Sequence, residues 1–212
     1  MGKYVNAAPK ASSEIEMVSS IGYDLNSAIS DIVDNSIHAI TSKRPKKPFI
    51  RINLLPNSDN PSLSILDNGI GMEKLELQDS MRIGCKNPND ERDSGDLGRF
   101  GSGLKTASFS QAEILSVLSK RSESISGAKF DKKRIIEKDS WDLEVLDQND
   151  IKTYDELGKL EKLESGTLVI WQNLSRYNPE DSSHQDVEKK LNSDIVDLKK
   201  HLSHFFHRFM SG

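Results

Sequence analysis

The sequence predicts a single α+β domain, and three observations support that prediction. Apolar residues recur every three or four positions over residues 23–40, which is typical of an amphipathic helix. Apolar and polar residues alternate in several short runs, which is typical of half-buried strands. No internal repeat or low-complexity linker divides the 212 residues, so one domain over residues 1–212 is the simplest partition.

The first predicted helix has clear ends. Asp24 is suited to cap the helix of residues 23–40, and Pro45 disfavours helical geometry before it, so the helix should end near Thr41. The other elements follow from alternation or helical spacing. In chain order they are strands 49–54 and 62–66, a weak helix 73–82, a polar loop 86–97, a short helix 100–109, strands 113–119, 129–137 and 141–147, a charged loop or short helix 150–165, a strand 166–174 and a helix 184–210.

Composition excludes several classes of protein. The chain is 35% hydrophobic and 29% charged, which excludes a fibrous, collagenous or fully disordered chain. The net charge of -4 gives no general attraction to nucleic acid, and the one cysteine, Cys85, cannot form an intramolecular disulfide. No segment has the length of a signal peptide core or a bilayer span, so we expect a soluble, cytoplasmic protein without a membrane partner.

The first candidate site lies on the helix predicted for residues 23–40. Asp31, Asn35 and His38 are separated by four and three residues, so they share one stripe of that helix, apart from the apolar stripe. A carboxylate and an amide one turn apart can hold a metal ion and a water in the same small space. A solvated helix face is the alternative interpretation of this pattern.

Two glycine-rich segments add further candidates, since seven of the 13 glycines fall between Gly69 and Gly103. In D-N-G-I-G-M, residues 67–72, an aspartate at a strand end precedes glycines that let a flat ligand approach the backbone. In G-R-F-G-S-G-L-K, residues 98–105, glycines precede a helix with Lys105 in its first turn, an arrangement suited to anions. A purely structural turn is the alternative interpretation of each segment.

In this order, the segments resemble the sequence boxes of the GHKL or Bergerat ATPase superfamily, which includes DNA gyrase B, heat-shock chaperones, histidine kinases and MutL. A fourth box corresponds to S-G-T, residues 165–167, at the start of a strand. The resemblance implies a two-layer α+β sandwich, in which helices cover one face of a mixed, mostly antiparallel sheet. Within the superfamily, M-R-I-G-C-K followed by G-R-F-G-S-G-L-K is most similar to Microrchidia-type (MORC) ATPases and their bacterial relatives.

The resemblance also implies ATP and Mg²⁺ as cofactors and a role for each matching residue. Asp31 would be the general base, Asn35 would coordinate Mg²⁺, and Asp67 would accept the adenine amino group. Residues 86–97 would form a lid over the nucleotide. The other implied cofactor contacts are Gly69, Gly71, Met72, Lys86, Gly98, Arg99, Phe100, Gly101, Ser102, Gly103, Leu104, Lys105 and Thr167.

Asp31 departs from the family pattern, which usually has glutamate at this position, so its carboxylate sits one methylene further back. Three functions stay open: slow Mg²⁺-dependent ATP hydrolysis with lid closure and nucleotide-dependent homodimerisation, an ATP-sensing module with negligible turnover, and a histidine-kinase-type catalytic domain. The resemblance also predicts that the chain is the N-terminal ATPase part of a longer protein. Regions beyond the helix 184–210 would then act on DNA or a protein client.

Overall fold

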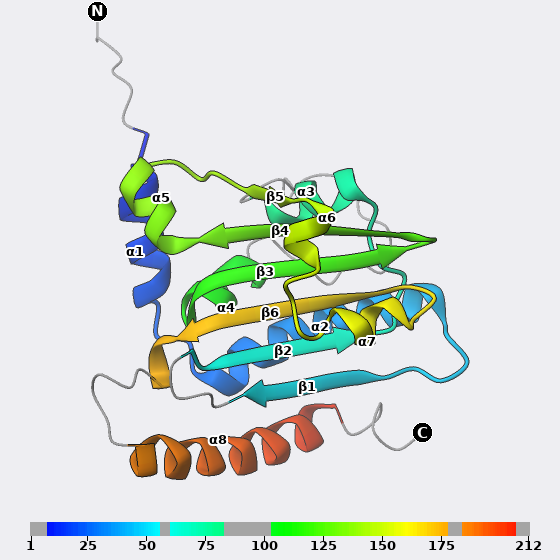
Figure 1. Ribbon diagram of the computed structural model, residues 1–212. Helices are drawn as coiled ribbons and strands as arrows, with labels where there is room; N and C mark the ends of the chain where they lie inside the picture. The colour runs from blue at the N-terminus through cyan, green and yellow to red at the C-terminus, as the bar shows by residue number, and fades with distance from the viewer. Residues whose placement is uncertain (1–7, 56–59, 83–102, 178–183, 207–212) are drawn as a thin grey trace, which may run out of the picture.

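The computed structural model describes residues 8–55, 60–82, 103–177 and 184–206 (Figure 1). Within these ranges the chain forms one six-stranded sheet in the order β1-β2-β6-β3-β4-β5, and each neighbouring pair is antiparallel. The α+β class is confirmed, and the described strands form an antiparallel sheet and not a mixed one. The strands are β1 (Ile50–Leu55), β2 (Ser62–Asp67), β3 (Ala112–Arg121), β4 (Ser124–Asp131), β5 (Glu144–Leu146) and β6 (Gly166–Leu174).

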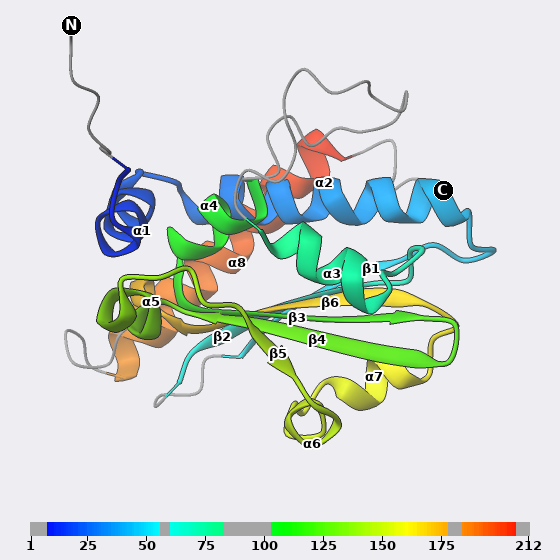
Figure 2. The ribbon, with the colours of Figure 1, turned by 90° about the horizontal axis from the view of Figure 1, so that it is seen from above.

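Helices lie on both faces of the sheet, and the larger layer contains α2. Figure 2 shows α2, α3, α4 and α8 on one side of the sheet and α6 and α7 on the other. The predicted helical layer is confirmed, and a second, smaller layer is added by the short helices of the charged segment. The helices are α1 (Ala11–Ser20), α2 (Leu25–Lys43), α3 (Lys74–Met81), α4 (Gly103–Phe109), α5 (Lys132–Lys138), α6 (Gln148–Ile151), α7 (Leu157–Glu161) and α8 (His184–Phe205), with a 3-10 turn η1 (Ser175–Tyr177).

Helix α2 forms as predicted, because its N-cap and its apolar stripe both favour a helix over these residues. The Asp24 carboxylate accepts a hydrogen bond from the Ser27 N–H at 3.0 Å and caps the first turn. The helix runs slightly past the predicted end, to Lys43, since Arg44 adopts left-handed geometry (φ 55°) just before Pro45. Helix α2 packs against α4, so the stripe that carries the candidate site has a neighbouring element.

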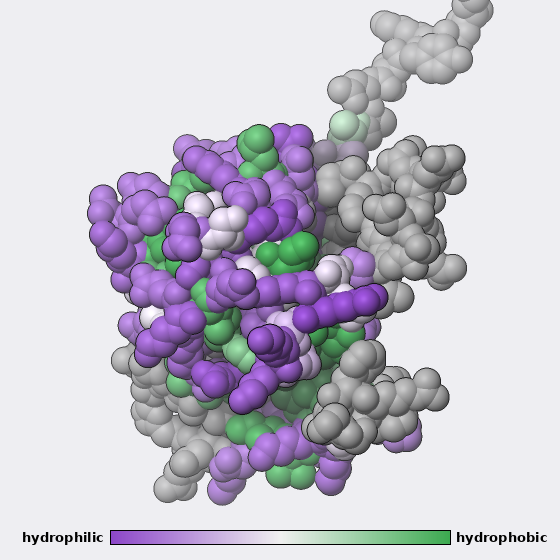
Figure 3. Space-filling model, turned by 90° about the vertical axis from the view of Figure 1, so that its right-hand side faces the viewer, coloured by the Kyte–Doolittle hydropathy of each residue, from purple (hydrophilic) through white to green (hydrophobic). Residues whose placement is uncertain are grey.

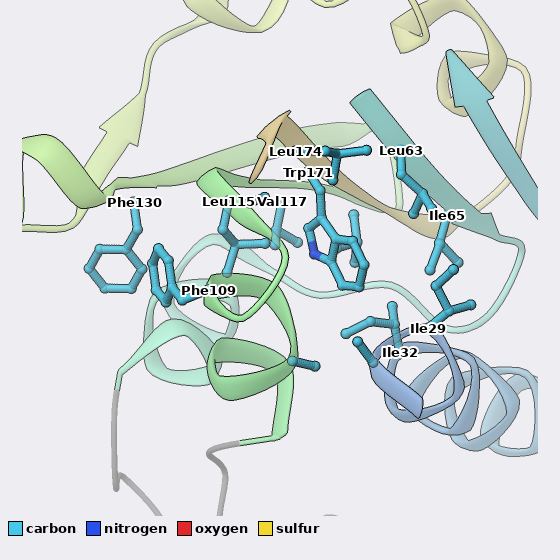
Figure 4. Packing of buried hydrophobic residues seen from close by; sticks show 14 of the residues in the cluster. Ile29, Ile32, Leu63, Ile65, Phe109, Leu115, Val117, Phe130, Trp171 and Leu174 are labelled. Atoms are coloured by element: carbon cyan, nitrogen blue, oxygen red, sulfur yellow. The ribbon is translucent and has the colours of Figure 1, made fainter. Parts of the chain in front are cut away.

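The main core lies between α2 and the sheet. Ile29 and Ile32 on α2 point toward Ile65 on β2 (Figure 4), and Trp171 on β6 is fully buried in the same cluster. The Trp171 indole N–H donates to the Ser108 hydroxyl of α4 at 2.7 Å. Each such buried side chain contributes roughly 1.5–3 kcal/mol. The core therefore fixes both α2 and α4 on one face of the sheet.

The strand predicted for residues 129–137 is wrong. Strand β4 ends at Asp131 and α5 begins at the next residue, because the Asp131 carboxylate accepts a hydrogen bond from the Lys133 N–H at 2.9 Å and caps the helix. The apolar pair near the end of this segment, Ile135 and Ile136, fits either period, so alternation could not distinguish a strand from one or two helical turns.

Two helices at the ends of the described chain complete the fold. Helix α1, which apolar patterning does not predict, is tied to the end of α5, because the Ser12 hydroxyl donates to the Asp139 carboxylate at 2.7 Å. Helix α8 confirms the helix predicted from residue 184, and His201 Nε2 lies 3.1 Å from the Ser30 hydroxyl of α2. The last predicted residues of α8, 207–210, lie outside the described ranges.

Two further features concern the hydropathy of the helices and of the surface. No helix within the described ranges is both long enough and apolar enough to cross a bilayer. The face on the right of Figure 1 is largely hydrophilic, and its apolar side chains occur in small scattered groups (Figure 3). This is the end of the sheet where β2 finishes and β6 begins, and the candidate site described next lies at this end.

Candidate functional site

Three parts of the fold meet where β2 ends: the loop that follows it, the start of β6 and the second half of α2. Asp67, the last residue of β2, pairs with Thr167 of β6. The Ser36 hydroxyl of α2 hydrogen-bonds to the Asp67 carboxylate. The Ile70 N–H of the loop donates to the Ala39 carbonyl of α2 at 3.1 Å. The structure therefore brings the second and fourth predicted segments together against the helix that carries the first.

Asp67 is a buried acid with a shifted protonation equilibrium. Its exposure is 3%, and burial raises its pKa from 3.8 to about 6. Hydrogen bonds partly oppose this effect, the first of them from the Gly69 N–H at 2.8 Å. At neutral pH the carboxylate is mostly ionised. A buried, ionised acceptor of this kind favours a ligand that donates an N–H, because each added donor offsets part of the cost of burying its charge.

Two glycines let the loop pass closer to its neighbours than any side chain would permit. A Cβ at Gly69 would lie 2.6 Å from the Ala39 Cβ. Gly71 has a left-handed φ of +68°, and a Cβ there would overlap the Lys120 carbonyl oxygen. The structure thus explains both glycines by close packing within the protein. Their approach to a ligand stays a prediction.

Side chains of β3 hold the same loop from the other side. The Ser119 hydroxyl accepts a hydrogen bond from the Met72 N–H at 2.8 Å and lies 2.9 Å from the Thr167 hydroxyl. Arg121 donates to the Gly71 carbonyl of the loop at 2.5 Å and forms an ion pair with Glu76 of α3 at 2.5 Å. Met72 and Thr167, both predicted site residues, are therefore joined through a serine that the sequence analysis does not identify.

The predicted catalytic stripe lies further toward the start of α2. Asp31 is half-buried, and Asn35 is exposed one turn along the helix. A Cβ at Gly103, the first residue of α4, would lie 3.8 Å from Asp31 Oδ2, so the start of α4 faces this carboxylate. The Tyr23 hydroxyl donates to the same oxygen at 2.6 Å. His38, the third member of the stripe, is half-buried.

Lys105 occupies a different environment from the one that an anion site suggests. The residue is 2% exposed, and its ammonium donates to the Ser80 carbonyl in the last turn of α3 at 2.9 Å. Leu104 beside it packs against the main core. Lys105 therefore ties α3 to α4, and its contact with phosphate stays a prediction. The predicted contacts that lie outside the described residues are Lys86, Gly98, Arg99, Phe100, Gly101 and Ser102, together with the lid 86–97.

The residues fit Mg²⁺ in only one way. The part of the chain that the structure describes holds no cluster of three or more His, Cys, Asp or Glu side chains able to bind a metal. The exposed amide of Asn35 suits the other common arrangement, in which one or two protein oxygens bind Mg²⁺ together with phosphate oxygens and waters. Asn35 therefore fits Mg²⁺ as the companion of a bound polyphosphate.

Sequence reasoning did not find several residues that shape this site. Ser36 directly follows Asn35, yet a buried serine in a helix gives no signal of a contact with Asp67 on β2. Ser119 and Arg121 stand on a strand, outside every glycine-rich segment, and only the pairing of β3 with β6 brings them to the loop. Tyr23 precedes the helix cap, and only the folded chain places its hydroxyl on Asp31.

Fold and site together define a class of protein. An antiparallel α+β sandwich with a buried aspartate at a strand end, a glycine loop after it and an acid–amide helix beside it is the arrangement of a GHKL-type ATP-binding domain. A comparison with family models agrees, since the model of the histidine kinase-, DNA gyrase B-, and HSP90-like ATPases matches residues 23–167. The chain belongs to this family of ATPase domains.

Two curated relatives are chaperones. The chain is 30% identical over 141 residues to the chaperone protein HtpG of Alkaliphilus oremlandii, covering 61% of this chain and 22% of the relative. It is 30% identical over 110 residues to the chaperone protein HtpG of Oceanobacillus iheyensis, covering 48% of this chain and 17% of the relative. The matches thus span about a fifth of the length of these relatives.

Proposed function

We propose that this chain binds Mg²⁺-ATP between the loop after β2 and helix α2, and hydrolyses it slowly. The observation that carries the proposal is the burial of the Asp67 carboxylate at 3% exposure, beside a glycine loop that is fixed to α2, to β3 and to Ser165 just before β6. A structural turn needs no buried carboxylate, and each donor that an ionised carboxylate gains in the core offsets part of the cost of burying its charge. The Gly69 N–H, the Ser36 hydroxyl and the Thr167 N–H already donate to Asp67, and an adenine amino group would add a further donor.

At the adenine end, Asp67 would accept the N–H of the amino group. Thr167, held by Ser119, would support the base and a bound water, while Gly69, Gly71 and Met72 would line the base plane. The pKa of Asp67, raised to about 6 by burial, leaves the carboxylate ionised at neutral pH, which is the form that accepts a hydrogen bond. Binding of ATP should therefore strengthen as the pH rises through about 6.

At the phosphate end, Asn35 would contribute an oxygen to Mg²⁺, which neutralises phosphate charge when it is bound. Gly103 and Leu104 open α4 beside Asp31, where the terminal phosphate would lie. Asp31 would take a proton from a water as that water attacks the γ-phosphorus. The bond from this phosphorus to the bridging oxygen then breaks, and ADP leaves with the electron pair.

Three further parts of the proposal rest on sequence similarity alone. Residues 86–97 would act as the ATP lid, with Lys86 and residues 98–102 at the phosphates. Nucleotide binding would favour a homodimer whose closure drives a downstream domain acting on DNA or a protein, and the HtpG chaperones favour a protein client. The chain would belong to the MORC-type subgroup, because the sequences of residues 81–86 and 98–105 resemble those of MORC-type ATPases.

The test is calorimetric titration of Mg²⁺-ATP into the purified chain and two variants. Asp67→Asn should weaken binding about a hundredfold, because it turns a charged acceptor into a neutral amide. Asn35→Ala should weaken binding about tenfold with Mg²⁺ and have no effect with EDTA. Asn192→Ala, which removes an exposed amide on α8, is the control. Unchanged affinity in both site variants would contradict the proposal.

An ATP-sensing module with negligible turnover is the second candidate, and the aspartate at position 31 favours it. Restoring the family glutamate with Asp31→Glu distinguishes the two functions. A gain in kcat of about a hundredfold from a barely measurable rate would indicate a sensor, because the longer side chain reaches the water. A modest change, together with loss of an existing activity in Asp31→Ala, would indicate an enzyme.

A further inference from the structure

The proposed base, Asp31, is held by a side chain from outside its own helix. Tyr23 precedes the cap of α2, and its hydroxyl donates to Asp31 Oδ2 at 2.6 Å. This hydrogen bond, followed by burial, raises the pKa of Tyr23 to about 12, so the phenol keeps its proton and remains the donor. Among the residues that the structure describes, no second group donates to Asp31, so Tyr23 holds Oδ2 alone.

Tyr23 is itself fixed relative to α4. Its carbonyl accepts a hydrogen bond from the Gln111 side chain at 2.7 Å, and Gln111 is 4% exposed at the junction of α4 and β3. The Tyr23 ring packs against the main core. The start of α4 faces the same Asp31 oxygen, with the Cβ position of Gly103 3.8 Å from Oδ2. Tyr23 thus links the carboxylate to the element that borders the proposed phosphate site.

We propose that Tyr23 is a positioning residue for ATP hydrolysis, which anchors Asp31 Oδ2 so that Oδ1 is presented to the attacking water; this inference rests on the proposed function. A base must lie within about 3 Å of the proton that it removes. Because aspartate is one methylene shorter than glutamate, small rotations of its carboxylate lose that contact. A hydrogen bond to one oxygen restricts those rotations and keeps the productive geometry populated.

The first test compares Tyr23→Phe with Tyr177→Phe in the full chain. Both variants remove a tyrosine hydroxyl bonded to an aspartate, since Tyr177 donates to Asp194 Oδ2 on α8 at 2.7 Å. Tyr23→Phe should lower kcat about tenfold and leave the KM and Kd for Mg²⁺-ATP within about twofold, because the hydroxyl acts on the base and not on the ligand. Tyr177→Phe should leave kcat unchanged.

The second test asks whether Tyr23 acts through Asp31. In an Asp31→Asn background, Tyr23→Phe should cause no further fall in the residual kcat, because the base that it positions is already gone. Urea unfolding of the nucleotide-free chain gives a readout independent of activity. For this readout the cycle uses Asp31→Ala, which removes the acceptor oxygens, and its four proteins should show a coupling of about tenfold in the unfolding constant between the two side chains.

Failure of this inference and failure of the proposed function give different results. A wild-type chain that does not bind Mg²⁺-ATP, or that binds it without turnover, would overturn the hydrolytic function and this inference together. An active wild type would overturn the inference alone if Tyr23→Phe keeps its kcat, raises KM instead, or lowers kcat equally in the Asp31→Asn background.

Discussion

The two ends of the site are built differently. We define the proposed adenine end as Asp67, Gly69, Gly71, Ser119 and Thr167, and the proposed phosphate end as Asp31, Asn35 and Gly103. The adenine end is buried, and hydrogen bonds from three elements fix its loop. The phosphate end has an exposed Asn35 and a half-buried Asp31 whose one described hydrogen bond comes from Tyr23.

This difference indicates where the free chain is organised in advance. A buried loop with satisfied hydrogen bonds has few alternative conformations, so it can recognise a base without rearrangement. An exposed amide and a short acid held by one hydrogen bond have less support, and a metal and phosphate oxygens would complete their surroundings. We therefore expect substitutions at the adenine end to affect both folding and binding, and those at the phosphate end to affect turnover with little effect on folding.

The largest effect is expected from Gly71→Ala. The left-handed φ of +68° and the overlap of a Cβ with the Lys120 carbonyl oxygen should destabilise the chain by about 3 kcal/mol and abolish Mg²⁺-ATP binding. Urea unfolding and calorimetry measure the two effects. Gly158→Ala is the matched control, because a Cβ there has open space and its helix should gain slightly in stability. Equal stability of the two variants would show that the loop is not tightly fixed.

The next effect concerns the pH dependence of stability. Asp67 has a pKa of about 6 in the folded chain, against an ordinary aspartate value of 3.8 once the chain unfolds, so the folded chain binds its proton more tightly. Its contribution to stability is present below about pH 4 and is lost as the pH rises through about 6, by up to about 3 kcal/mol. Asp67→Asn should remove this loss and be more stable than wild type at pH 7. If the free energy of unfolding changed equally in the wild type and in Asp67→Asn from pH 4 to 7, the result would contradict a buried charge at Asp67.

At the phosphate end, Asp31→Asn should separate chemistry from folding. Loss of the base should lower kcat about a hundredfold, or by about 3 kcal/mol in the barrier. The amide oxygen can still accept the Tyr23 hydrogen bond, so the free energy of unfolding should change by less than about 1 kcal/mol. Steady-state kinetics and urea unfolding check both statements. An unchanged kcat would show that another group removes the proton.

The smallest effect is expected from Gly103→Ala. A Cβ there would meet Asp31 Oδ2 at 3.8 Å, which is an ordinary van der Waals distance. Alanine should also favour the first turn of α4, so the free energy of unfolding should change by less than about 1 kcal/mol. The contrast with Gly71→Ala in the same unfolding assay tests the difference between the two ends. A loss as large as that of Gly71→Ala would mean that the phosphate end is packed as tightly as the adenine end.

The same contrast explains how much could be predicted from the sequence. Periodicity predicts α2 and β6 well, because each is long, has one pattern, and ends at a cap or a turn. It fails at residues 129–137, where a single aspartate cap turns a strand into a helix. Glycines and strand-end acids stand out in a sequence, so Asp67 and Gly71 could be predicted as candidates. Tyr23, Ser36 and Ser119 carry none, because their partners are distant in the sequence.

Adenine recognition by Asp67 can be measured by competition between ATP and GTP for the wild-type chain and for Asp67→Asn. Guanine has a carbonyl where adenine has its amino group, so a buried ionised Asp67 should favour ATP by about a hundredfold. Asp67→Asn should abolish that preference, and Asp139→Asn, at an exposed acid that ends α5, should retain it. Equal affinity of the wild-type chain for ATP and GTP would contradict adenine recognition by Asp67.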